Sequence, residues 1–123
     1  MPKQRKSLAG DLTGTAWEHF QKKKFDASRQ SFEEVLEEDP NSAEALYGKA
    51  CVLYRTSDYE SSLDCLNELI EQHPDDLKFL HTRAMVYGSD EQYGEAERDL
   101  KKVVADDPQN VEAWCDLGGL YLV

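Results

Sequence analysis

Three of the four prolines recur at a fixed interval: Pro40, Pro74 and Pro108 are equally spaced along the chain. A constant period of this size indicates repeated supersecondary units, each of which buries its apolar faces against its neighbours. The chain of 123 residues accommodates about three such units and part of a fourth. The sequence therefore predicts a stacked array of similar units rather than a single closed core.

Other residue types follow the same period, which defines the inside of each unit. The series are small (Ala16, Ala50, Ala84), aromatic (Phe25, Tyr59, Tyr93) and large apolar (Phe32, Leu66, Leu100). Apolar residues three and four apart predict two amphipathic helices per unit. We expect the small residues Ala50 and Ser62 to face each other where the two helices approach closely. Leu66 is expected to fill the gap to the next hairpin.

Polar residues mark the predicted helix ends. Each of the three prolines follows a polar or acidic pair and ends one helix before the next begins. Asn41 to Glu44 and Ser57 to Glu60 have the spacing of a capping box, in which the first side chain accepts a hydrogen bond from a free backbone N–H. We therefore expect helices to start directly after Asn41 and Ser57.

The residues from Trp114 to Tyr121 match the motif W-x-x-L-G-x-x-Y, and Ala96, Leu100 and Pro108 match A-x-x-x-F…P with Leu in place of Phe. The chain thus resembles a tetratricopeptide repeat (TPR) protein over about residues 8–123, and the proline spacing equals the TPR unit length of about 34 residues. The resemblance implies an all-α fold. In that fold, about seven helices form antiparallel hairpins in a right-handed superhelical array.

The period also divides the chain. We expect a basic, disordered tail over residues 1–7 and a TPR domain over 8–123. The expected repeats span about 9–42, 43–76 and 77–110, followed by a half repeat over 111–123. Because the last unit stops after one predicted helix, we expect an exposed apolar patch at this end. The chain is then either a fragment of a longer array or an array whose end is covered by another molecule.

The amino-acid composition limits the classes of function that we expect for this chain. With 25 acidic and 14 basic residues, the net charge of −11 disfavours binding to nucleic acids or to anionic membranes. No apolar run approaches the roughly 18 residues of a membrane span. Three cysteines without a C-x-x-C motif suggest reduced thiols in an intracellular protein, expected to be cytoplasmic.

The resemblance implies a non-catalytic protein-interaction module that holds a peptide or helix of a partner protein in a concave groove. The groove positions transferred from the family are Trp17, Phe20, Tyr47, Cys51, Tyr54, Lys78, His81 and Met85. Many of these are aromatic, a class that is enriched at binding hot spots, so we expect an apolar or aromatic ligand with basic flanks. The alternative is that Trp17 and Phe20 pack the end of the array and Tyr54 packs near Tyr59.

A second hypothesis is a structural or assembly segment of a larger TPR protein. Such a chain would self-associate as a homodimer, or dock, through its open C-terminal helix. The residues expected at that end are Trp114, Leu117, Tyr121 and Leu122.

Two further roles are disfavoured. The chaperone-tail clamp of some TPR domains needs lysine, asparagine and arginine donors. The matching positions here are Thr13, Trp17, Gly48, Lys78 and Thr82. Only Lys78 fits, so we do not expect binding of the acidic chaperone tail.

A catalytic or metal site is the other disfavoured role. Cys51, His81 and Cys115 are all predicted to face the groove, but no carboxylate is evidently placed to orient His81, and zinc would need a fourth ligand. We therefore expect no catalytic residue, no metal and no cofactor.

Overall fold

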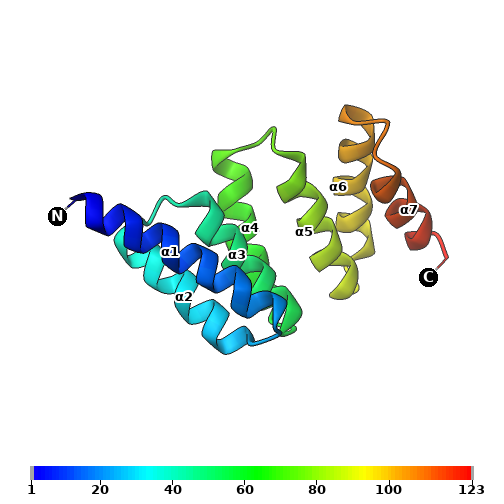
Figure 1. The fold of residues 1–123 in the computed structure, drawn as a ribbon. Coiled ribbons are helices and arrows are strands. Elements are labelled where there is room, and N and C mark those ends of the chain that lie inside the picture. The colour runs from blue at the N-terminus through cyan, green and yellow to red at the C-terminus, as the bar shows by residue number, and fades with distance from the viewer. Residues whose placement is uncertain (1, 123) are drawn as a thin grey trace. The chain divides into compact units, whose positions relative to one another are not determined.

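The computed structural model describes the backbone of residues 2–122 and the side chains of residues 11–122. Seven α-helices make up this part of the chain (Figure 1). They are α1 (Pro2–Gln21), α2 (Phe25–Glu38), α3 (Ala43–Arg55), α4 (Tyr59–Gln72), α5 (Leu77–Ser89), α6 (Tyr93–Asp106) and α7 (Val111–Leu120). The helices pack as sequential antiparallel pairs, which confirms the predicted all-α, TPR-like array.

Helix α1 begins earlier than the sequence analysis expected. Its backbone is helical from Pro2, where we expected a disordered tail over residues 1–7. Lysine, arginine and glutamine in this stretch all have good helix propensity, and proline is tolerated in the first turn of a helix.

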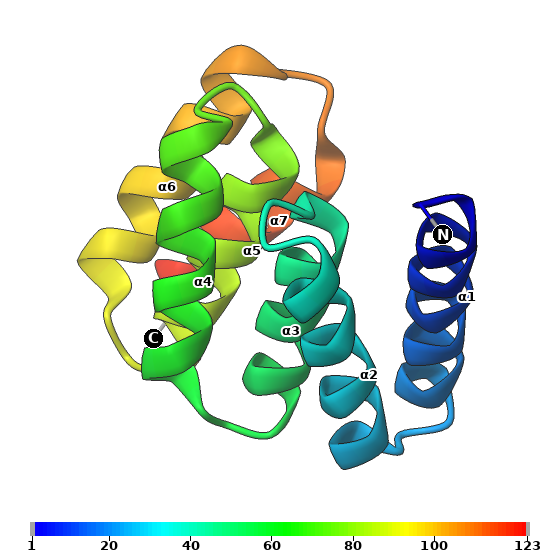
Figure 2. The same cartoon turned by 90° about the vertical axis from the view of Figure 1, so that its left-hand side faces the viewer.

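The chain divides into two compact units, residues 1–65 and residues 66–123, here called the N-terminal and C-terminal units. In the N-terminal unit α2 packs against α1 and against α3, as Figure 2 shows. The buried core residues of this unit are Ala16, Phe32, Val35, Ala45 and Val52. In the C-terminal unit α6 packs against α5 and α7, around a buried core of Leu80, Ala84, Leu100, Val103, Val104, Ala113 and Leu117.

Small residues of the repeat lie where the two helices of a hairpin contact each other. The Ser62 hydroxyl donates a hydrogen bond of 2.8 Å to the Ala50 carbonyl, which confirms that these two residues face each other. One repeat earlier, the Ser28 hydroxyl donates to the Ala16 carbonyl at the same distance. Both serines are completely buried, so these bonds satisfy hydroxyl groups that would otherwise be costly to bury.

Gly48 of α3 lies directly against the ring of Phe32 on α2. A Cβ atom built at this glycine would lie 2.2 to 2.7 Å from three atoms of the Phe32 ring. Any larger residue would therefore have to displace a ring that lies in the centre of the core.

The helix starts differ from the predicted capping boxes by one residue. Ser42, not Asn41, caps α3 by accepting a hydrogen bond from the Ala45 N–H at 3.2 Å. Asp58 accepts from the Ser61 N–H at 3.3 Å. Ser57 instead occupies the left-handed region, with φ of 65°. The predictions were wrong because two neighbouring residues can both cap a helix, and the path of the preceding turn decides which one does.

Ser57 belongs to a repeating turn. Lys23 and Glu91, one repeat period before and after it, also have positive φ, at 60° and 61°. All three lie in the short connection between the two helices of a hairpin. The positive φ angle of this turn thus recurs with the repeat period, although none of the three residues is glycine.

Candidate functional site

The expected groove residues fall on both units. In the N-terminal unit five rings form what we call the aromatic cluster: Trp17, Phe20, Phe25, Phe32 and Tyr47. The Trp17 ring centroid lies 5.5 Å from that of Phe20, 5.0 Å from that of Phe32 and 6.3 Å from that of Tyr47. The Phe20 and Phe25 centroids are 5.6 Å apart. These distances are typical of favourable edge-to-face and tilted aromatic contacts.

Polar groups border the aromatic cluster. The Trp17 indole N–H donates a hydrogen bond of 3.3 Å to the Glu44 carboxylate. The Arg55 guanidinium lies over two rings, 5.6 Å from the Phe20 centroid and 5.3 Å from that of Phe25. Phe32 is completely buried, whereas Trp17, Phe20 and Tyr47 are half-buried. Trp17 and Phe20 thus pack against the core of this unit and remain partly accessible.

Two other expected groove residues lie along α3. Tyr54 is half-buried and its ring centroid is 6.2 Å from that of Tyr59. Cys51 is half-buried and belongs to no disulfide. Of the other cysteines, Cys65 is buried and Cys115 is exposed, and neither forms a disulfide.

An acidic cleft lies on the N-terminal unit. Its volume is about 650 Å³, and its lining residues come from α1 and α2: Leu12, Gln30, Glu33, Glu34, Glu37 and Glu38. Lys49 of α3 reaches Glu33 with an N–O distance of 3.3 Å. Four carboxylates in one cleft produce a negative potential that attracts cationic groups.

In the C-terminal unit the expected groove residues have different surroundings. Met85 is 40% exposed, and the Lys78 ammonium lies 5.4 Å from the centroid of the Phe79 ring. His81 Nε2 lies 2.7 Å from Asp116 Oδ2. The expectation that no carboxylate is placed to orient His81 was therefore wrong. The repeat period could have indicated the contact between His81 and Asp116. Asp116 lies one period after Thr82, and Thr82 is the neighbour of His81 on the preceding first helix.

The C-terminal end is apolar and exposed, with one exception among the residues named for it. Leu122 is 89% exposed, Tyr121 60% and Trp114 50%, and the Trp114 indole N–H donates to the Pro108 carbonyl at 2.9 Å. Leu117 is instead buried, so its assignment to an exposed docking surface was wrong. It lies four residues after Ala113 on the face of α7 that packs into the core. Val111, which the sequence analysis did not name, is exposed on the same helix.

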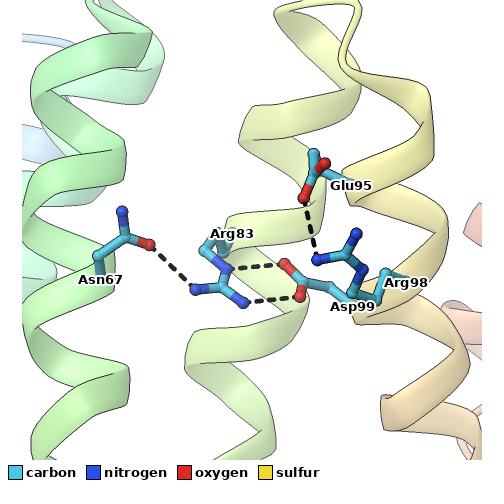
Figure 3. Close-up of polar contacts among 5 residues, drawn as sticks. All are labelled: Asn67, Arg83, Glu95, Arg98 and Asp99. Atoms are coloured by element: carbon cyan, nitrogen blue, oxygen red, sulfur yellow. Dashed lines mark hydrogen bonds and ion pairs between the residues drawn. The ribbon is translucent and has the colours of Figure 1, made fainter.

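A partly buried polar contact connects α4, α5 and α6 (Figure 3). Arg83 of α5 makes two hydrogen bonds to Asp99 of α6, at 2.8 and 2.7 Å, and a third of 3.0 Å to Asn67 of α4. The hydrogen bonds to Asp99 raise the pKa of Arg83 above its ordinary value. One repeat earlier, Lys49 and Glu33 occupy the positions of Arg83 and Asn67. The contact from a first helix to the preceding second helix therefore occurs in two repeats. The contact to the almost fully buried Asp99 does not repeat, because Cys65 stands one repeat before Asp99.

No helix within the described residues is both long enough and apolar enough to cross a membrane.

The comparisons with known proteins identify the family. Two tetratricopeptide repeat models match residues 19–85 and residues 81–123, and the chain belongs to this family. A search of curated protein sequences found no match.

Solved structures share the fold. MamA residues 41 to the end from Desulfovibrio magneticus RS-1 superposes with a TM-score of 0.86 at 23% identity, over 93% of this chain and 64% of that one. The chain therefore spans less than two thirds of that MamA structure. The first TPR domain of Spaghetti (RPAP3), bound to the HSP90 peptide SRMEEVD, has a TM-score of 0.86 at 18% identity, over 94% of this chain and 92% of that one. The Arabidopsis OM64 TPR domain has a TM-score of 0.87 at 14% identity, over 95% and 97%. TPR domains are generally protein-interaction modules and are usually non-catalytic.

Proposed function

We propose that this chain is a non-catalytic module that binds a peptide segment or short helix of a partner protein, with the half-buried rings of the aromatic cluster and Tyr54 of α3 as its main contact. The observation that supports this most directly is the half-buried state of Trp17 and Tyr47, which lie on the neighbouring first helices α1 and α3. Rings held by their neighbours lose little conformational entropy on binding. They also bury a large apolar area, which is typical of hot-spot residues.

The charge of the surroundings favours a particular ligand chemistry. Glu44 borders Trp17, and the acidic cleft lies on the same unit. With a net charge of −11, the chain attracts cationic segments over a distance. The proposed ligand therefore carries one or two large apolar or aromatic side chains flanked by lysine or arginine.

The test uses peptides selected from a displayed random library on the full chain. Affinities are then measured by fluorescence polarisation for the wild type and for the variant Tyr47→Ala with Tyr54→Ala. We expect the double substitution to weaken binding by about 1–2 kcal/mol or more, which is roughly tenfold or greater. Tyr93→Ala is the matched control, because Tyr93 is an exposed tyrosine on the second helix α6.

Two results would contradict the proposal. One is unchanged affinity in the double variant while its helicity by circular dichroism is intact. The other is an equal loss of affinity in Tyr93→Ala. Raising the salt concentration should slow association if the basic flanks contribute as proposed.

The acidic chaperone tail is not part of this proposal, although the RPAP3 domain with the same fold binds an HSP90 peptide. At the positions that match the clamp, Trp17 and Gly48 stand where amide donors are needed, and Gly48 is buried against Phe32. We expect a labelled SRMEEVD peptide to show no saturable binding in the same polarisation assay. Saturable binding at micromolar concentration would refute this assignment.

A second candidate function is assembly through the C-terminal end, as a structural segment of a larger TPR protein or as a homodimer. The exposure of Val111, Trp114, Tyr121 and Leu122 favours it, because several large apolar residues exposed near one end of a chain are characteristic of interaction sites. Sedimentation velocity at several concentrations should then show a dimer that Trp114→Ser with Tyr121→Ser abolishes. A chain that remains monomeric at high concentration would count against self-association.

A further inference from the structure

Three potential metal ligands converge on the C-terminal unit. His81 lies on α5, and Glu112 and Asp116 lie on α7. Each residue offers one ligand atom, and these three atoms all lie within 4.8 Å of one another. His81 Nε2 and Asp116 Oδ2 are the closest pair, at 2.7 Å. Among the described residues this is the group of histidine, cysteine and acidic side chains whose spacing suits a metal ion.

The two helices hold the three side chains in place through the core beneath them. Glu112 and Asp116 are four residues apart, so they lie on the same face of α7. Leu117, next to Asp116, and Leu80, next to His81, are both buried in the core of this unit. The backbone positions of His81 and Asp116 are therefore set by packing, which is what a preorganised site requires.

We propose that His81, Glu112 and Asp116 form a binding site for a divalent transition-metal ion of the zinc type. One imidazole nitrogen and two carboxylate oxygens are ligands that Zn²⁺ accepts in tetrahedral coordination, with a fourth position left to water. Around a tetrahedral ion at about 2.1 Å, ligand atoms lie about 3.4 Å apart. The present separations, up to 4.8 Å, reach that value by rotation of side chains, which the half-exposed Asp116 and exposed Glu112 permit.

The ligand set also predicts which ions bind. An imidazole nitrogen favours Zn²⁺, Ni²⁺, Co²⁺ or Cu²⁺ over Mg²⁺ and Ca²⁺, which prefer six or more oxygen ligands. The hydrogen bond between His81 and Asp116 is the interaction that the ion replaces.

The experiment is isothermal titration of the full chain with ZnCl₂ at neutral pH. It is carried out on Cys115→Ser, because the exposed thiol next to Asp116 is a competing zinc ligand. We expect one ion per chain to bind with a Kd below about 100 µM. His81→Gln and Asp116→Asn should each weaken binding by about tenfold or more, and Glu112→Gln should weaken it measurably.

His73→Gln is the matched control, because His73 is an exposed histidine in the connection before α5 and does not belong to the group of three. It should bind zinc as the parent does. A second readout is nuclear magnetic resonance with Co²⁺, whose paramagnetism should affect signals of α5 and α7 around His81 and Asp116 first. Circular dichroism of each variant without metal checks that it is folded.

Several outcomes would overturn the proposal. They are no saturable zinc binding in Cys115→Ser up to about 1 mM, binding that survives both His81→Gln and Asp116→Asn, and equal competition by Mg²⁺. The first would show that His81 and Asp116 form only a structural contact. The last would indicate diffuse attraction of cations to an acidic surface.

Discussion

Replacement of Gly48 by alanine is a sharp test of the packing of the N-terminal unit. The added Cβ atom has two opposite effects on the free energy of unfolding, one through helix propensity and one through packing. Alanine has the higher helix propensity, so in an exposed helix interior Gly→Ala stabilises by about 0.8–1.0 kcal/mol. At Gly48, however, the added Cβ would lie 2.2 Å from an atom of the Phe32 ring. Normal contact between carbon atoms is about 3.5–4.0 Å, so the ring would have to move by more than about 1 Å.

The expected net effect follows from the burial of that ring. Phe32 is completely buried, so it has little free space to move into. Overpacking of a core typically costs about 1–3 kcal/mol, and this site belongs in the upper half of that range. After the gain in helix propensity, we expect Gly48→Ala to lower the free energy of unfolding by about 1–2 kcal/mol.

Urea denaturation followed by circular dichroism measures the change. Gly14→Ala is the matched control, since no heavy atom of a neighbouring residue lies within 4 Å of a Cβ built at this exposed position in α1. We expect that control to be neutral or to stabilise the chain by up to about 1 kcal/mol. If Gly48→Ala stabilised the chain as much as Gly14→Ala does, the close approach of α3 to Phe32 would be refuted.

Three further substitutions probe other parts of the fold by the same denaturation assay. Asp99→Asn should cost about 1–3 kcal/mol, less than a fully buried pair because Arg83 keeps 20% of its side-chain exposure. Folding raises the pKa of Arg83 above its ordinary, strongly basic value, so the stability that Arg83 contributes is present throughout the neutral range and is lost only in strong alkali. We therefore expect Asp99→Asn to lower the free energy of unfolding equally at pH 6 and pH 9. A loss of stability that disappears at pH 9 would contradict this reasoning. Leu66→Ala should cost about 2–5 kcal/mol because Leu66 is completely buried, and a loss below about 1 kcal/mol would mean that the repeat is misassigned. Ser57→Gly should stabilise the chain by up to about 1 kcal/mol because φ is 65° there, whereas a destabilised variant would show that the serine side chain is needed in the turn.

The repeated contacts explain how one short sequence pattern builds several hairpins. Buried serine hydroxyls bond to a carbonyl 12 residues earlier in two repeats. A cationic side chain on a first helix reaches the preceding second helix in two repeats, at Lys49 and at Arg83. Each of these contacts joins a helix to its neighbour in the sequence, which is typical of repeat proteins.

Much of the fold was predictable from the sequence because the same pattern of residue types recurs in each repeat. A constant period, with small, aromatic and large apolar positions in fixed order, predicted about seven helices and the residues on their buried faces. Ala50 and Ser62 could be paired for the same reason. Periodicity identifies the face of a helix that is buried, and this face depends only on spacing along one chain segment.

The tertiary structure alone decided which side chains lie opposite one another. Leu117 is buried although it is part of an apolar end, because α6 covers that face of α7. Gly48 is essential for packing only because the ring of Phe32 lies against it. His81 and Asp116 are 35 residues apart, and their contact depends on how α5 and α7 are held by the core between them. Spacing along the chain does not encode such distances between helices, since rotation of a helix about its own axis by a few tens of degrees would bring different residues into contact.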